Sequence, residues 1–94
     1  MNPSFSDYEA AARGDGYDEV AERVWPPDAV AGTHSHDFAV KALVVAGEMW
    51  LTEGERTRHL RAGDAFELAA GAPHAERYGA EGATYWAARR HAKG

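Results

Sequence analysis

Three histidines, at positions 34, 36 and 74 of the 94-residue chain, form the pattern with the clearest chemical meaning. His34 and His36 are separated by one residue at the head of an apolar run, and successive side chains of a strand alternate between its faces. The two imidazoles therefore share a face and can bind one metal ion if a further ligand, such as His74, comes from elsewhere. Three histidines with open positions form a known catalytic metal site. The pattern predicts a divalent transition metal (Fe, Zn, Ni, Mn or Cu), and histidines that merely line a wet pocket are the alternative.

Two further polar side chains follow His74 on the same predicted strand face. Glu76 and Tyr78 stand two and four residues after this histidine, so regular alternation points all three the same way. The hypothesis is that both line the pocket as candidate catalytic residues. Under this hypothesis, Glu76 is a metal ligand, a hydrogen-bond partner of a metal ligand, or a general base. A twist or bulge of the strand would instead turn both side chains to solvent.

Apolar side chains are expected to form the walls of this pocket. Phe38 and Val40 share strand parity with the neighbouring histidines, which makes them the favoured contacts of a ligand. An apolar wall beside a metal favours a small organic molecule over a sugar phosphate. Filling of the core is the simpler account of each wall residue. The candidates for the lining are Phe38, Val40, Val44, Trp50, Phe66, Leu68 and Trp86.

The charge of the chain limits its partners. A formal net charge of −5 disfavours nucleic acid, because nucleic-acid binding rests on clustered cations against phosphate. The arginines at 56, 58 and 61 are interpreted as the solvated face of an edge strand, and His59 and His91 are expected at the surface. The chain has no cysteine for disulfide or thiol chemistry. It also shows no secretion signal and no apolar stretch of membrane-spanning length, so we expect a cytoplasmic protein without a membrane partner.

The elements that must position these residues are mainly short strands. Ser6 and Glu9 match a capping box, which predicts a short helix over residues 7–13 that Gly14 ends. Glycine-containing turns then separate runs typical of strands. They predict one domain over residues 1–94, with a helix and turn at 1–17, a small β-barrel at 18–89 and a polar tail at 90–94. The expected strands are 18–25, 29–31, 34–46, 48–52, 56–60, 65–68, 74–78 and 83–89, with turns at 47, 53–55, 62–64 and 81–82.

Two motifs cover about half of the chain. The histidine pair opens the first motif, which closes on Gly47 and is followed by Glu48. The second motif contains Gly63-Asp64, Gly71 and His74. In their order and separation these motifs resemble those of the cupins, although Ala69 and Tyr78 replace a proline and an asparagine. The resemblance implies an all-β fold, a small jelly-roll barrel of the cupin type with a short N-terminal helix.

The resemblance also implies a metal inside the barrel, held by the two histidines of the first motif, a glutamate and the histidine of the second. In this sequence Val40 stands at the position of the glutamate. Lys41 occupies the position that some cupins use instead, but its strand parity is opposite to that of the histidines. We therefore expect Lys41 to face outward and the metal site to lack the family's carboxylate.

Several functions agree with these features. The first is a metal-dependent enzyme that acts on a small organic molecule, with dioxygenase- or isomerase-like chemistry among the reactions that the resemblance allows. The second is a cupin that binds or senses a small molecule without turnover, and the third is a structural dimer with a vestigial, metal-free pocket. Small size and family habit favour a homodimer, for which the helix from Ser6 and the strand with Val20, Val24 and Trp25 are candidate contacts.

Overall fold

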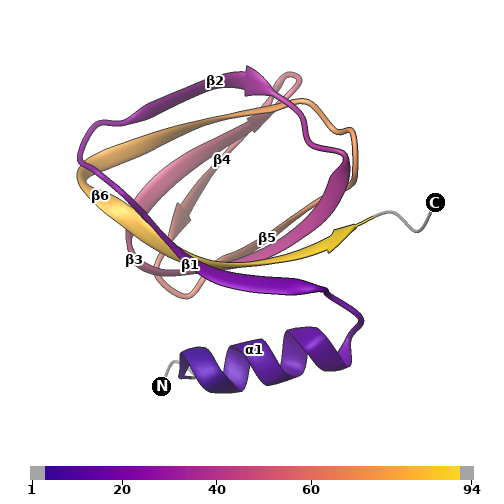
Figure 1. The fold of residues 1–94 in the computed structure, drawn as a ribbon. Helices are drawn as coiled ribbons and strands as arrows, with labels where there is room; N and C mark the ends of the chain where they lie inside the picture. Colours follow the sequence, from indigo (N-terminus) through magenta and orange to yellow (C-terminus); the bar gives the residue numbers. More distant parts are fainter. Residues whose placement is uncertain (1–3, 92–94) are drawn as a thin grey trace.

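The computed structural model describes residues 4–91, which contain one helix followed by six strands (Figure 1). All strand pairs are antiparallel, in the order β1-β6-β3-β4, with β2 added to β6 and β5 added to β3. The strands curl around a common core, and the helix lies outside them. This arrangement confirms the predicted all-β jelly-roll class with a short N-terminal helix. The elements are α1 (Phe5–Gly14), β1 (Glu19–Trp25), β2 (Val30–His34), β3 (Phe38–Glu53), β4 (Arg56–Arg61), β5 (Ala65–Leu68) and β6 (His74–His91).

Two long, bent strands form the centre of the fold. β3 and β6 pair from Phe38 opposite His91 to Thr52 opposite Ala75, with register shifts around Gly47. The turns predicted at 47 and at 81–82 are therefore wrong. Gly47 and Gly82 have φ of 72° and 71°, which residues other than glycine rarely adopt, and they bend continuous strands without ending them.

The bend at Gly47 also changes which side chains of β3 face the core. Before it the buried residues are Val40, Ala42 and Val44, at even positions, whereas after it they are Met49 and Leu51, at odd positions. Trp50 was expected among the residues that line the lumen, and this prediction is wrong because the bulge at Gly47 reverses the parity of β3. The remaining members of the core cluster are Leu60, Phe66, Leu68, Tyr78, Ala83, Tyr85 and Ala87.

The turns around β4 and β5 follow the sequence closely. Gly54 and Glu55 form a two-residue turn between β3 and β4, and Gly54 has the positive φ of 59° that such a turn requires. Gly63, with φ of 98°, lies in the turn before β5. The strand predicted at 65–68 has the bounds of β5.

The helix begins earlier than the sequence pattern predicted. Ser4 is the N-cap, its Oγ accepts a hydrogen bond from the Asp7 amide at 3.1 Å, and the Asp7 side chain completes the capping box. Glu9 instead forms an ion pair with Arg13 at 3.2 Å. Asp7 takes the role in the capping box that was predicted for Glu9, because its carboxylate accepts a hydrogen bond from the Ser4 amide at 3.5 Å, and the helix therefore begins two residues earlier. Within residues 4–91, no helix has the length and apolar character needed to cross a membrane.

Trp86 of β6 holds the helix against the outside of the sheet. Phe5 meets its ring edge-on at 5.6 Å between centroids, and Tyr8 lies 5.8 Å away. The Trp86 indole N–H donates to Glu22 Oε2 at 2.9 Å, so the prediction that Trp86 lines the lumen is wrong. At the end of the chain, Arg90 and His91 belong to β6 and not to a tail, and residues 92–94 lie outside the described part.

Candidate metal centre and cavity

Strand pairing brings the three histidines together. His34 ends β2 and lies opposite His74, the first residue of β6. His36 follows in the connection to β3, so the prediction that the pair lies on one long strand is wrong. The three side chains nevertheless converge, since one candidate ligand atom from each lies within 4.8 Å of the others. The spacing needed for a shared metal is therefore present.

Backbone carbonyls fix two of the imidazole rings. His34 Nδ1 lies 2.6 Å from the carbonyl oxygen of Gly32, and His74 Nδ1 lies 3.0 Å from that of Ala72. A carbonyl oxygen only accepts hydrogen bonds, so each Nδ1 carries a proton, and in the neutral ring each Nε2 therefore keeps a free lone pair. Metal-binding histidines are held in the same way by a partner on the second ring nitrogen. The donor set therefore fits a transition metal that prefers neutral imidazole.

The third ring, His36, is held by an aromatic stack. It lies nearly parallel to the ring of Phe38, with 4.7 Å between centroids and 12° between planes. Partial burial lowers its pKa below the usual 6.5, and the positive charges of His34, His74 and Arg89 act in the same direction against the opposing effect of Glu76. This histidine thus keeps its neutral, metal-binding form to a lower pH than a free imidazole does.

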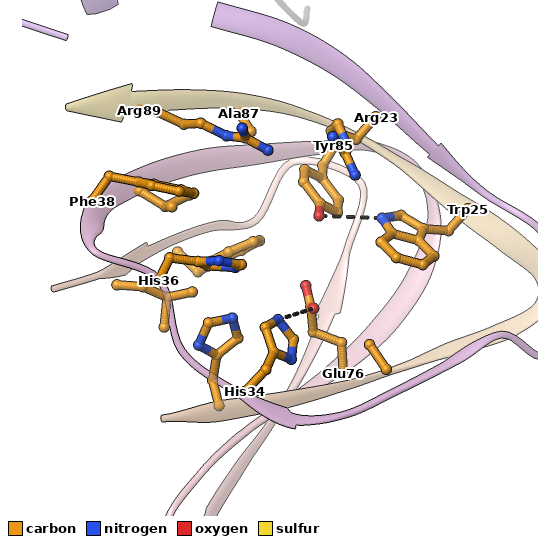
Figure 2. A pocket seen from close by; sticks show the side chains of 14 residues that line it. Arg23, Trp25, His34, His36, Phe38, Glu76, Tyr85, Ala87 and Arg89 are labelled. Atoms are coloured by element: carbon orange, nitrogen blue, oxygen red, sulfur yellow. Dashed lines mark hydrogen bonds and ion pairs between the residues drawn. The ribbon is translucent and has the colours of Figure 1, made fainter. Parts of the chain in front are cut away.

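The Glu76 carboxylate lies beside the histidines (Figure 2). This residue is 7% exposed, and its Oε2 is 3.8 Å from His34 Nε2. Val40, at the position of the family's glutamate, contributes only an apolar wall. The Lys41 ammonium pairs with Asp15 at 3.4 Å, in agreement with the predicted outward direction. The carboxylate near the three histidines therefore comes from β6.

Tyr78 lies behind Glu76 and not on the wall of the cavity. Its side chain is 1% exposed, stacks on Trp25 at 4.8 Å and donates a hydrogen bond to Glu76 Oε1 at 3.0 Å. Burial raises the pKa of Tyr78, and the neighbouring Tyr85 and Glu76 raise it further. The phenol is therefore protonated at neutral pH, and it positions the carboxylate, leaving Oε2 toward His34.

Replacing Tyr78 with phenylalanine should lower the free energy of unfolding by about 1–3 kcal/mol, because the buried Glu76 carboxylate loses its donor. Urea unfolding followed by circular dichroism measures the change. Tyr17→Phe is the matched control, since Tyr17 is half-buried beneath Arg90 and its substitution should change stability by less than about 0.5 kcal/mol. Equal losses in the two variants would contradict the role assigned to the Tyr78 hydroxyl.

The three histidines and Glu76 line a cavity of about 170 Å³, and Figure 2 shows His34 and Glu76 side by side at one end of it. Phe38, Val40 and Phe66 lie on its wall, in the positions expected of pocket residues. Trp50 does not, because it stacks on His59 at 4.6 Å beneath Arg77 on the other face of β3. The lining consists of Arg23, Trp25, Ala31, His34, His36, Phe38, Val40, Phe66, Leu68, His74, Glu76, Tyr85, Ala87 and Arg89.

Sequence reasoning missed six side chains of this lining, which are Arg23, Trp25, Ala31, Tyr85, Ala87 and Arg89. Tyr85 and Arg89 share strand parity on β6, and Arg23 lies opposite Tyr85 in the β1–β6 register. The alternation of residues 85, 87 and 89 was a usable signal, but only once the inward face of this strand was known. Trp25, whose indole N–H donates to Tyr85 Oη at 3.2 Å, follows from the same pairing.

Solved structures with the same fold differ widely in sequence. The Cnp3 cupin domain of Schizosaccharomyces pombe matches with a TM-score of 0.71 and 12% identity, over 78% of this chain and 52% of that chain. Oxalate decarboxylase of Bacillus subtilis matches with a TM-score of 0.70 and 22% identity, over 77% of this chain and 20% of that chain. KdgF from a Halomonas species matches with a TM-score of 0.66 and 19% identity, over 78% of this chain and 69% of that chain. This chain thus spans about half the length of the first and a fifth of the second. At these identities the likeness shows the fold.

The sequence itself places the chain in a family. A comparison with curated proteins found no match. The model of the family Cupin_2, described as a cupin domain, matches residues 21–86. That range contains most of β1, all of β2 to β5, the histidine cluster and most of β6. The chain therefore belongs to the Cupin_2 family of cupin domains.

Proposed function

We propose that this cupin binds a divalent transition metal through His34, His36 and His74 and holds a small organic molecule in the adjoining cavity. The observation that carries the proposal is the convergence of one nitrogen from each ring within 4.8 Å, with Nε2 free on two of them. The Bacillus subtilis oxalate decarboxylase, which shares the fold, has Mn(II) centres, and this supports metal binding by a protein of this fold.

The residues around the site have separable tasks. His34 and His74 would bind the metal through Nε2, and His36 would complete the set. A bound metal supplies a Lewis acid that can polarise a ligand oxygen. Glu76, whose Oε1 is occupied by Tyr78, keeps Oε2 available as a further ligand or as a proton acceptor. Phe66 and the other apolar walls exclude water from the ligand. If turnover occurs, dioxygenase- or isomerase-like chemistry is compatible with such a site.

The metal content of protein purified without an affinity tag tests the proposal. We expect about one equivalent of a transition metal per chain, by mass spectrometry, after growth in supplemented medium and gel filtration. Chelator treatment followed by titration with Mn²⁺, Fe²⁺, Ni²⁺ and Zn²⁺ then ranks the metals. A chain that holds no metal after supplementation and shows no saturable binding in the titration would contradict the proposal.

One observation favours binding of a small molecule without metal as a second function. His34 Nε2 lies 3.8 Å from Glu76 Oε2, so a protonated His34 would form an ion pair with that carboxylate inside the cavity. Such a pair would close the site to metal and leave a polar end for a neutral or charged ligand. A saturable ligand with unchanged affinity in the presence of a chelator distinguishes this function from the first.

Metal affinity should depend on pH in a defined direction. An imidazole must be neutral to bind a metal, so affinity is constant above about pH 7 and falls as pH drops below about 6.5. His36, whose pKa is lowered, should stay neutral to a lower pH than an unperturbed histidine does. Chelator competition from pH 8 to pH 4.5 measures the profile. Retention of the full metal content at pH 4.5 would contradict a site of three histidines.

A further inference from the structure

Two arginines lie on the cavity wall that faces the histidines and Glu76. Arg23 comes from β1 and Arg89 from β6, and both line the cavity. Figure 2 shows their side chains on the side of the cavity opposite His34 and Glu76. Any molecule that fills the cavity from the histidines to the far wall therefore meets a guanidinium group.

Neither guanidinium is neutralised within the described residues. The ion pairs found in residues 4–91 involve Arg13, Lys41, Arg58 and three histidines as the cations, and no side-chain hydrogen bond of Arg23 or Arg89 is present there. Arg89 is instead placed by an aromatic ring, with its Cζ 4.8 Å from the centroid of Phe38. An arginine offers five N–H donors and no acceptor, so its unused donors call for an anion or for water.

The cavity is positive although the chain is acidic. Arg23 and Arg89 contribute two positive charges to its lining, and Glu76 is the one carboxylate among the residues that line it. The chain as a whole carries a net charge of −5. A divalent metal on the histidines would add two more positive charges. A concave site of this sign with apolar walls concentrates anions from solution.

We infer that the ligand of this cavity is a small organic carboxylate, with its anionic group at Arg23 and Arg89 and its apolar body against walls such as Phe66 and Leu68. This inference rests on the proposed function, because it takes the cavity beside the histidines as the place where the ligand binds. Planar carboxylates accept paired N–H donors from a guanidinium. Phosphate fits less well, because its remaining charged oxygens would face apolar walls. The cavity volume is about 170 Å³. A cavity of about 150 Å³ admits benzene, so the apolar part of the ligand should be about the size of a benzene ring.

Benzoate and benzamide form a matched pair of probes, since they have the same number of non-hydrogen atoms and differ in charge. We expect benzoate to bind at least about tenfold more tightly than benzamide to both the metal-free and the Zn²⁺-loaded protein, by calorimetry or NMR titration at pH 8. Arg89→Gln should reduce this preference to below about threefold, and Arg23→Gln should reduce it independently. Arg90→Gln is the control, because Arg90 lies next in sequence but over the ring of Tyr17, at 5.1 Å, and does not line the cavity.

The outcomes separate this inference from the proposed function. Zn²⁺ affinity, measured on the same samples, should stay within about threefold in all the arginine variants. If the protein binds Zn²⁺ but binds benzoate no better than benzamide, or if Arg89→Gln and Arg23→Gln both keep the full preference, the carboxylate subsite is refuted and the metal site stands. If the chain binds no Zn²⁺ but the metal-free form keeps a preference that the two variants lose, the metal site is refuted and the subsite stands.

Discussion

Replacing His74 with alanine should lower the affinity for a divalent transition metal by at least about 100-fold. Removing a residue that only orients a metal ligand through a hydrogen bond already lowers metal affinity by about 10–100-fold. His74 is itself a metal ligand in the proposed site, so its loss should cost at least as much. His74 is 3% exposed and lies opposite His34. Its loss also removes the aromatic ring closest to that of His34, with 4.3 Å between ring centroids. Competition with a calibrated chelator measures the affinity, and circular dichroism checks that the variant is folded.

His59→Ala is the matched control for this substitution. The His59 ring lies on the outer face of the sheet, where it contacts Glu48 at 2.8 Å and stacks on Trp50. Its removal should leave metal affinity unchanged within about twofold. A His74→Ala variant that is folded and binds metal as tightly as the unmodified chain would refute the assignment. Equal weakening by the two substitutions would show that binding occurs at general surface histidines.

Replacing Gly47 with alanine should lower the free energy of unfolding by at least about 3 kcal/mol. The residue has φ of 72°, and a Cβ there would lie 2.9 Å from Ala83 Cα and would overlap the carbonyl oxygen of Gly82. Backbone cannot move aside as a flexible side chain can, so the two bent strands would have to separate. Domains of this size have a total stability of roughly 5–15 kcal/mol, and a loss of this magnitude is readily measured by urea unfolding.

Gly14→Ala provides the comparison for Gly47→Ala. A Cβ at Gly14 would meet no atom within 4 Å, and its φ is not in the left-handed region. This substitution at the end of α1 should change stability by less than about 0.5 kcal/mol or increase it slightly. If Gly47→Ala were as mild as Gly14→Ala, the bend at Gly47 would not depend on close backbone contact.

The strands were largely predictable because short-range signals define them. Gly54 and Gly63 stand where tight turns need positive φ, so β4 and β5 follow from the sequence almost residue by residue. Gly47 and Gly82 carry the same local signal, yet they bend strands that continue. A glycine with positive φ occurs both in hairpin turns and in β-bulges. Whether Gly47 and Gly82 end a strand or bend it depends on the pairing of β3 with β6, which the sequence does not show.

The histidines were predictable and the opposite wall of the cavity was not. His34, His36 and His74 stand out by type and spacing, and Glu76 follows from alternation after His74. Arg23 and Arg89 reach the same cavity from strands at the two ends of the chain, and a partly exposed arginine looks in sequence like any solvated cation. The carbonyl groups that orient His34 and His74 belong to the backbone and leave no sequence signal at all.

The most direct test of the three-histidine site is a crystal structure of the protein loaded with Zn²⁺ or Mn²⁺, with anomalous difference maps collected at the absorption edge of that metal. We predict one strong peak bonded to Nε2 of His34, Nε2 of His74 and one ring nitrogen of His36, at about 2.0–2.1 Å for zinc. The metal should lie at the edge of the cavity, beside Glu76. A peak at His59 and Glu48 or at His91 and Glu19, with none between the three histidines, would contradict the proposed site.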